Sequence, residues 1–187
     1  MSERVVILGI GGIGGVVAGC MIEAGLRPVL VTNNAEVTAA IRANGLRVRL
    51  PDRAFAVQAD VYTTPAEAPG TFDAAYLTMK ALSVVEAAKD VAKNLSTGGY
   101  VVTFQNGIVE DAVGDAIGIE RVVSASVGWN GIMHNPGDYE RTTPGDTFVG
   151  ELDGTMTPRL NAVSVALRTV GPVTISQNMR GVLWSKL

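Results

Sequence analysis

Apolar positions along this chain follow two patterns, short continuous runs and longer stretches with helical spacing. Ser2 to Gly9 contains RVVILG, a β-branched run that ends at a glycine and is typical of a buried parallel strand. Apolar residues then recur at helical spacing from Ile13 to Ala24, and Gly25 is placed to cap that helix. The next predicted elements are a strand at Pro28–Thr32 and a helix at Ala35–Asn44, which Gly45 closes.

The β-α-β-α pattern continues after an insertion. Leu46–Leu50 and Ala54–Ala59 alternate or nearly alternate apolar and polar residues around Pro51-Asp52, as an antiparallel hairpin does. Strands that alternate with helices predict an α/β fold, here a Rossmann-like, doubly wound, mainly parallel sheet with helices on both faces. The later elements are strands at Phe72–Met79, Gly99–Gln105, Arg121–Trp129 and Asp146–Val149, and helices at Ser83–Leu95, Val109–Ile117, Pro158–Val170 and Asn178–Leu187.

The first strand and helix lie in a run without charge, Val5 to Ile22, which has about the minimum length of a transmembrane helix. Within it, Val17–Cys20 also has the form of a bacterial lipobox. A signal peptide begins with a positively charged segment, whereas Arg4 is balanced here by Glu3. Because strand and helix patterns continue directly after Gly25, the sequence favours a globular fold over a membrane span or a lipid anchor.

Three glycines between the first strand and the first helix form the pattern G-x-G-x-x-G. In a dinucleotide-binding turn the first permits a tight turn, the second lets backbone approach a pyrophosphate, and the third lets helix and strand pack closely. The helix start supplies free N–H groups to the phosphates, so no basic residue is needed, and the absence of a lysine excludes a P-loop. We therefore expect a dinucleotide to be bound by Gly9, Ile10, Gly11, Gly12, Ile13 and Gly14.

The residues at the end of the second strand indicate whether the chain binds NAD or NADP. An acidic residue there binds the ribose 2′-hydroxyl of NAD, and an arginine accommodates the 2′-phosphate of NADP. This chain has Thr32-Asn33-Asn34, and an asparagine side chain can pair with either group. Because Asn33 is not acidic, we expect NADP (NADPH) as the cofactor, with NAD as the open alternative.

Composition narrows the function classes. The 15 basic and 18 acidic residues are scattered along the chain without a basic stripe, so we expect no nucleic-acid partner. The single cysteine, Cys20, cannot form an internal disulfide, and a buried thiol in a cytoplasmic protein is expected. The single histidine, His134, lies in the turn-rich segment MHNPGDYE, where we expect an exposed loop side chain and no metal site.

Together with the glycine turn, four segments make the chain resemble the 2-dehydropantoate 2-reductases, also called ketopantoate reductases. These segments are LTMKAL, TFQNGI, GELDG and LWSKL, in matching order and spacing over essentially all 187 residues. The resemblance implies an oxidoreductase of pantothenate biosynthesis that reduces ketopantoate, a 2-keto acid, to pantoate with NADPH. It also implies a Rossmann domain over residues 1–187 that ends in the first part of a helix, followed in the family by a helical domain.

The resemblance also implies roles for individual residues. Lys80 and Asn106 are expected to lie along the cofactor near its reacting end, and Gly131 where the backbone touches the nicotinamide side. Lys186 corresponds to the catalytic lysine, whose ammonium group stabilises negative charge growing on the keto oxygen and donates a proton.

The residues alone support plainer interpretations of several of these positions. Both lysines would be solvated surface groups, and Asn106 with the glycine after it would form an ordinary turn. Glu110 and Asp111 are expected to complement a helix dipole. Trp129 and Trp184 are expected to pack against other residues rather than to form stacking platforms.

Two departures from the family leave alternatives open. Asn33 stands where the family commonly has arginine, and the asparagines, serine and glutamate of the family's helical domain are not found in this sequence. The chain can therefore be half of a ketopantoate reductase, completed by a C-terminal domain or associated as a homo-oligomer. The alternatives are a dehydrogenase of another 2-keto or hydroxy acid and a non-catalytic NAD(P)-binding module.

Overall fold

The computed structural model describes residues 3–187, so Met1 and Ser2 lie outside the described residues, and Ser2 is the first residue of the predicted first strand. The main sheet contains β1 (Val5–Leu8), β2 (Val29–Val31), β5 (Val61–Tyr62), β6 (Phe72–Leu77), β7 (Leu95–Thr103), β8 (Val122–Val127), β11 (Thr147–Glu151) and β12 (Val173–Ile175). A second sheet contains β3 (Leu46–Arg49), β4 (Ala54–Val57), β9 (Gly131–Asn135) and β10 (Asp138–Arg141). The helices are α1 (Gly12–Glu23), α2 (Ala35–Asn44), α3 (Val84–Ala92), α4 (Glu110–Ile117), α5 (Pro158–Leu167) and α6 (Met179–Trp184), with short 3-10 turns η1 (Pro65–Glu67), η2 (Ala81–Ser83) and η3 (Ile119–Arg121).

The main sheet has the strand order β12-β11-β8-β7-β6-β1-β2-β5. From β5 to β8 all neighbouring strands are parallel, in the arrangement typical of doubly wound dinucleotide-binding folds. Only β11 runs antiparallel to its neighbour β8, within the part of the chain described. The predicted fold class is therefore confirmed. The winding reverses between β1 and β6, where such sheets open a crevice at the carboxyl ends of their strands.

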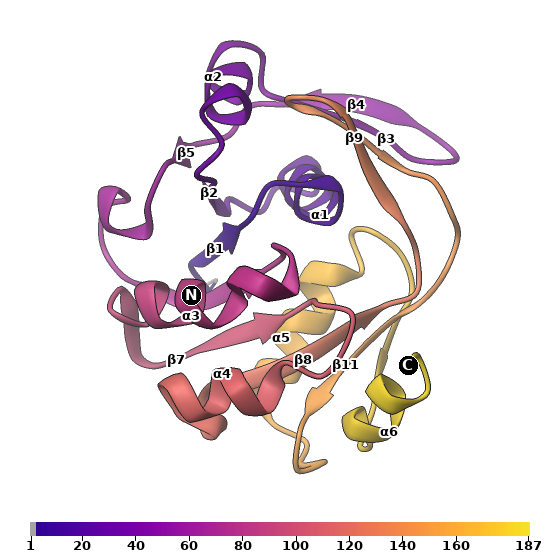
Figure 1. The fold of residues 1–187 in the computed structure, drawn as a ribbon. Coiled ribbons are helices and arrows are strands. Elements are labelled where there is room, and N and C mark those ends of the chain that lie inside the picture. The colour runs from indigo at the N-terminus through magenta and orange to yellow at the C-terminus, as the bar shows by residue number, and fades with distance from the viewer. Residues whose placement is uncertain (1–2) are drawn as a thin grey trace.

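Helices cover both faces of the main sheet (Figure 1). On one face α3 and α4 contribute Val84, Ala88 and Val113 to a core that also contains buried residues of β1 and β6. On the other face α1 and α5 lie over a larger core that includes Val16 and Leu160. The central strands β1, β6 and β8 are thus buried on both sides, which explains the continuous apolar runs in the sequence.

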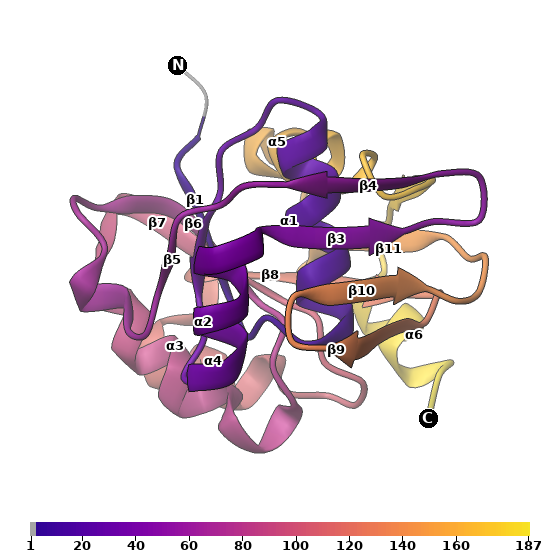
Figure 2. The same ribbon diagram turned by 90° about the horizontal axis from the view of Figure 1, so that it is seen from above.

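The second sheet explains why the first helix is apolar all round. Strands β4, β3, β10 and β9 lie side by side across α1 (Figure 2), so the helix is enclosed between two sheets. Gly15 packs against the ring of Tyr139 from β10, and Gly19 against Val48 from β3. Cys20 is buried there, as predicted, and burial raises the pKa of its thiol to about 12. A helix with apolar residues on every side needs such double coverage, and no helix within residues 3–187 is long and apolar enough to cross a bilayer.

Several predicted boundaries are wrong. The third helix ends at Ala92 rather than Leu95, because Leu95 already begins β7. The segment around His134 forms β9 and β10 rather than a loop, although the His134 side chain is exposed as expected and lies 2.6 Å from a Glu140 carboxylate oxygen. The C-terminal helix covers Met179–Trp184 only. Strands β5 and β12 were not predicted, since each has only two or three residues.

Candidate functional site

The glycine turn lies at the reversal point of the main sheet, between the ends of β1 and β6. Gly9 has a φ of +92°, and a Cβ there would meet the backbone nitrogen of Met79 at 2.6 Å. A Cβ on Gly14 would clash with the Gly9 carbonyl, so this glycine permits close packing of helix and strand. At Gly11, by contrast, a Cβ would meet no atom of residues 3–187 within 4 Å. The middle glycine therefore faces open space, where a ligand can approach the backbone.

The start of α1 presents unpaired amides to that space. Its N-cap is Gly11, no side chain caps it, and its first turn holds no acidic residue. The carbonyl of Ile10 accepts a hydrogen bond from the Tyr139 hydroxyl at 3.2 Å, which fixes the turn against the second sheet. Free helical N–H groups and the positive end of the dipole form an anion-binding position.

A cavity of about 490 Å³ extends from this turn along the carboxyl ends of the neighbouring strands. Eight residues predicted from the sequence line it: Gly9, Ile10, Gly11, Gly12, Ile13, Lys80, Asn106 and Gly131. Gly131 lies against Gly12, where a Cβ on either residue would clash with the other's carbonyl group. Thr32 and Asn34, from the segment that the sequence placed at the end of the second strand, also line it, and further lining residues that the sequence did not single out are Val37, Thr78, Met79, Ala81, Phe104, Gln105 and Met133.

Three predicted site residues lie outside the cavity wall. Gly14 is buried beneath the turn, and Lys186 is an exposed residue beyond the wall. Asn33 is also exposed, while its neighbours Thr32 and Asn34 line the cavity. The Asn34 side chain accepts hydrogen bonds from the backbone amides of the first turn of α2, so it caps that helix. The end of β2 thus offers neutral polar groups to the cavity.

Gln105 connects the two strand ends that carry Lys80 and Asn106. Its Nε2 donates to the carbonyl oxygens of Leu77 at 2.7 Å and Met79 at 2.8 Å, and its Oε1 accepts from the Phe104 amide at 3.1 Å. The side chain is only 6% exposed. Sequence reasoning missed this residue, although its position before Asn106 at the end of a predicted central strand was a usable signal.

Lys186 reaches the cavity through Asn106. Its Nζ donates to the Asn106 Oδ1 at 3.2 Å and to the carbonyl oxygen of Val127 at 2.9 Å. Partial burial lowers the pKa of the Lys186 ammonium group. Two predicted residues that are 80 positions apart in sequence therefore meet beside the cavity, and the ammonium group lies where it can serve a ligand held there.

The Glu110 carboxylate at the start of α4 does more than complement the helix dipole. Glu110 is 1% exposed, and its carboxylate accepts hydrogen bonds from the hydroxyls of Thr103 (2.8 Å) and Ser124 (2.9 Å) and from the Val109 amide (3.0 Å). Asp111 lies in the same first turn, as predicted, and pairs with Arg180. Glu110 thus anchors the loop that carries Asn106 to strands β7 and β8.

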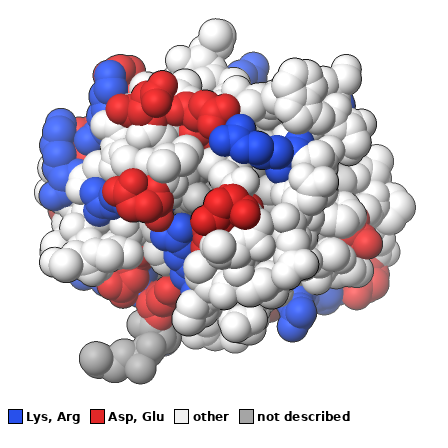
Figure 3. Space-filling view, turned by 90° about the horizontal axis from the view of Figure 1, so that it is seen from below, with Lys and Arg blue, Asp and Glu red and all other residues white. Residues whose placement is uncertain are grey.

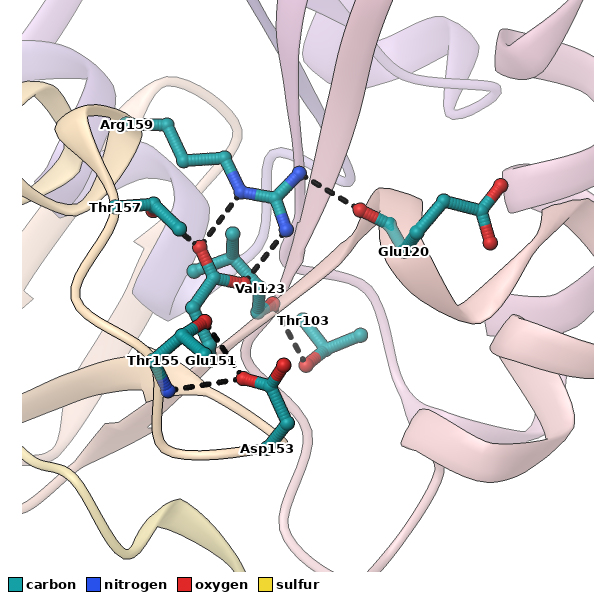
Figure 4. Close-up of polar contacts among 8 residues, drawn as sticks. All are labelled: Thr103, Glu120, Val123, Glu151, Asp153, Thr155, Thr157 and Arg159. Carbon is teal, nitrogen blue, oxygen red and sulfur yellow. Dashed lines mark hydrogen bonds and ion pairs between the residues drawn. The ribbon is translucent and has the colours of Figure 1, made fainter.

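The segment GELDG lies at the opposite end of the sheet from the glycine turn. Arg159 and Thr157 converge on the carboxylate of Glu151, while Asp153 accepts hydrogen bonds from Thr155 (Figure 4). The two Arg159–Glu151 contacts are 2.7 and 2.6 Å, and the Glu151 side chain is 5% exposed. This segment therefore ties β11 to α5 and is remote from the cavity.

The two tryptophans differ in environment. Trp129 is 3% exposed and its Nε1 donates to the Thr147 hydroxyl at 3.1 Å, so the packing prediction is confirmed there. Trp184 is 66% exposed, and for it the prediction is wrong. In α6 the buried positions are Met179 and Leu183, and a residue directly after a buried one points away from the same face.

Charge is evenly mixed on the surface shown in Figure 3, where acidic and basic side chains are interspersed. Among residues 3–187 no group of three or more His, Cys, Asp or Glu side chains is arranged to hold a metal ion. The polar residues that line the cavity are Lys80 and neutral residues with amide or hydroxyl side chains, beside the backbone amides of the glycine turn.

One known protein family and two curated relatives match this chain over most of its length. The family described as "Ketopantoate reductase PanE/ApbA" matches residues 5–154. A 2-dehydropantoate 2-reductase of Halobacterium salinarum is 25% identical over 98% of the chain and 61% of the relative. Another of Pyrococcus abyssi is 30% identical over 98% of the chain and 59% of the relative. The chain thus spans about three fifths of the length of these curated relatives.

Solved structures show the same fold. The 2-dehydropantoate 2-reductase of Geobacter metallireducens superposes with a TM-score of 0.88 at 22% identity, covering 98% of this chain and 61% of that one. A D-mandelate dehydrogenase in complex with NADH and anilino(oxo)acetate has a TM-score of 0.86 at 18% identity, covering 98% and 60%. At these identities the likeness establishes the fold and leaves the substrate open.

Proposed function

Because the chain belongs to the ketopantoate reductase PanE/ApbA family, we propose that it is the dinucleotide-binding part of an NADPH-dependent reductase of 2-dehydropantoate. Residues 1–187 are proposed to act as one Rossmann domain. The observation that carries the proposal is the open space beside Gly11 at the start of α1, within a cavity that also contains Lys80 and Asn106.

The residues present fit a dinucleotide. The free amides of α1 suit a pyrophosphate, and no first-turn carboxylate repels it. Lys80 and Asn106 follow β6 and β7, so they lie on the far side of the reversal point from the adenine end. Bound there, a nicotinamide cofactor supplies hydride to the keto carbon of the substrate.

The preference for NADPH is supported by the end of β2. Thr32, Asn33 and Asn34 include no carboxylate that would select the 2′-hydroxyl of NAD. Asn33 is exposed next to two cavity residues and can donate its amide to a 2′-phosphate. Without an arginine in this segment we expect a modest preference, and NADH is the matched comparison ligand.

Lys186 is the proposed catalytic residue. As hydride reaches the keto carbon, negative charge grows on the oxygen, and an ammonium group can stabilise it and transfer a proton to give the alcohol. Asn106 and the Val127 carbonyl hold the Lys186 Nζ in place. Its lowered pKa makes it a better proton donor than a fully solvated lysine.

The binding test is calorimetry with NADPH and NADH on wild type and Gly11→Val. A Cβ added at Gly11 would meet no atom of residues 3–187 within 4 Å, so the variant should fold normally, yet it should weaken both nucleotides at least about tenfold by filling the pyrophosphate position. Ala24→Val, at the exposed C-terminal end of the same helix, is the matched control and should bind like wild type. Equal heats for wild type and Gly11→Val would reject the assigned phosphate turn.

The reductase assignment is tested by NADPH oxidation with 2-dehydropantoate. Residues 1–187 alone should turn over slowly, since the relatives place two fifths of their length elsewhere. Lys186→Ala should lower that rate by about 100-fold or more while leaving NADPH binding within about twofold of wild type. Lys89→Ala, an exposed lysine on α3, is the control. Nucleotide binding without any substrate-dependent oxidation would favour a non-catalytic module.

A further inference from the structure

A second cavity, of about 710 Å³, lies at the opposite end of the main sheet from the glycine turn. It opens between the last turn of α1 and helix α5, beneath the starts of β1 and β2. Its wall is mostly apolar and includes Val5, Met21, Leu26 and Ala166. Such an apolar wall with a few polar groups is the usual form of a small-molecule site.

One wall residue carries a polar atom that the fold leaves unsatisfied. The hydroxyl of Tyr76 has no hydrogen-bond partner among residues 3–187, and the whole residue is 0% exposed. A buried hydroxyl without a partner costs free energy, so such groups are rare unless a ligand or a water molecule completes them. Burial raises the pKa of Tyr76, which therefore stays a protonated donor at neutral pH.

The groups around Tyr76 determine what kind of atom it can meet. Glu3 lies in the same wall and accepts a hydrogen bond from the Tyr100 hydroxyl at 2.9 Å. Burial raises the pKa of the Glu3 carboxyl, and the same loss of solvation would disfavour a second anionic group beside it. The partner of the Tyr76 hydroxyl should therefore be a neutral oxygen.

An arginine at the rim of the cavity can bind an anionic group of a ligand near the opening. Arg27 lines the cavity, is exposed, and forms no salt bridge with any residue in the range 3–187. Arg4, the other cationic residue of the wall, lies over the ring of Phe72 at 5.1 Å. Arg27 is thus the guanidinium available for a carboxylate at the opening.

We propose that this cavity is a second ligand site, which binds a small amphipathic carboxylate. Its apolar body lies between α1 and α5, a neutral carbonyl or hydroxyl oxygen accepts from Tyr76, and its carboxylate pairs with Arg27. The site is separate from the nucleotide cavity, because the two lie at opposite ends of the parallel strands.

Three aromatic probes of similar size test the three parts of this proposal. 4-Acetylbenzoate carries ring, ketone and carboxylate, 4-isopropylbenzoate lacks the ketone oxygen, and 4-methylacetophenone lacks the carboxylate. Their affinities for residues 1–187 are measured by NMR titration in the presence of saturating NADPH, which keeps the probes out of the nucleotide cavity. 4-Acetylbenzoate should bind about fivefold more tightly than either partial probe.

Variants then assign each contact. Tyr76→Phe should weaken 4-acetylbenzoate about fivefold and leave 4-isopropylbenzoate unchanged. Arg27→Gln should weaken both carboxylates about threefold. Ala162→Phe, which fills the cavity from α5, should abolish binding, whereas Ala43→Phe on the exposed face of α2 should not. Thermal melting by circular dichroism checks that every variant is folded.

Two results would overturn the proposal. If no probe binds at millimolar concentration to folded wild type, the cavity is not a ligand site. If Tyr76→Phe leaves the affinity for 4-acetylbenzoate unchanged, solvent satisfies the hydroxyl and the assigned contact is wrong. Neither result depends on whether the chain reduces ketopantoate.

Discussion

At the residue scale, Gln105 shows how one side chain can position others without being charged. It uses both donor hydrogens and its acceptor on backbone atoms of two neighbouring strand ends. Those ends carry Met79 and Asn106, which both line the nucleotide cavity. Because a buried amide can satisfy a donor and an acceptor at once, glutamine suits this position better than any other side chain of its length.

We predict that Gln105→Leu lowers the free energy of unfolding by about 2–3 kcal/mol, because it leaves two carbonyls and an amide unpaired in a buried place. NADPH affinity should fall about tenfold, because Gln105 would no longer hold the ends of the two strands that carry cavity residues. Gln105→Glu should be at least as destabilising, since it turns the donor toward Leu77 and Met79 into another acceptor. Urea unfolding and calorimetry measure both effects, with exposed Gln58→Leu as control; wild-type stability in both Gln105 variants would contradict the assigned role.

At the scale of elements, α6 is held by few contacts. It has six residues, of which Met179 and Leu183 are buried, and the Asn178 side chain caps it through the Gly181 amide at 2.9 Å. One ion pair joins it to α4, between Arg180 and Asp111 at 2.7 Å. Since the proposed catalytic lysine follows α6 directly, the stability of this helix bears on where the ammonium group lies.

We predict that Arg180→Gln lowers the stability of α6 at neutral pH and leaves that stability unchanged in acid. Arg180 lowers the pKa of Asp111, so the pair stabilises the fold above the unfolded pKa of about 3.9 and is lost as the pH falls through the lower folded value. Both side chains are about half exposed, so the effect should be about 0.5 kcal/mol.

Hydrogen exchange of α6 amides, compared between Arg180→Gln and wild type at each pH, measures this effect. Lys93→Gln, which breaks a similar surface pair at the C-terminal end of α3, should leave α6 unchanged. A difference between wild type and Arg180→Gln that persists unchanged at pH about 2 would show that the pair is not its cause.

At the scale of the whole molecule, the two ends of the main sheet carry different sets of functional and structural residues. The carboxyl ends of the strands hold the glycine turn and the nucleotide cavity, whereas the other end carries the second cavity and the Glu151–Arg159 pair. Arg159 also donates to the Glu120 carbonyl at 2.9 Å and lies over the Tyr100 ring at 5.3 Å. The pair thus connects β11, α5, η3 and β7 in one place.

We predict that Arg159→Met destabilises the protein by about 3 kcal/mol, because it leaves the Glu151 carboxylate buried without its cation. The double variant Glu151→Gln, Arg159→Met should be more stable than Arg159→Met alone, since no buried charge remains. Arg53→Met, which breaks an exposed pair with Glu23, should cost less than about 1 kcal/mol. Urea unfolding compares the three, and NADPH affinity should not change in any folded variant.

The sequence by itself determined the parts of this protein that depend on neighbouring residues. The β-α-β unit, the glycine turn and the exact span of α2 were predicted because strand runs, caps and turn glycines act over a few residues. The family resemblance named Lys80, Asn106 and Lys186, and the structure brings the last two together. Their roles, with those of the other predicted site residues, stay predictions until the variants are measured.

Only the tertiary structure decided which distant segments meet. The apolar run of α1 allowed several interpretations, because periodicity cannot say what covers a helix; strands β3 and β10, about 90 residues apart along the chain, cover it here. The structural roles of Gln105, Glu110 and Tyr76, whose hydroxyl has no partner among residues 3–187, likewise did not follow from the sequence, since a polar side chain is significant only once its burial and partners are known. Long-range pairing and burial are properties of the packed chain, which no local pattern encodes.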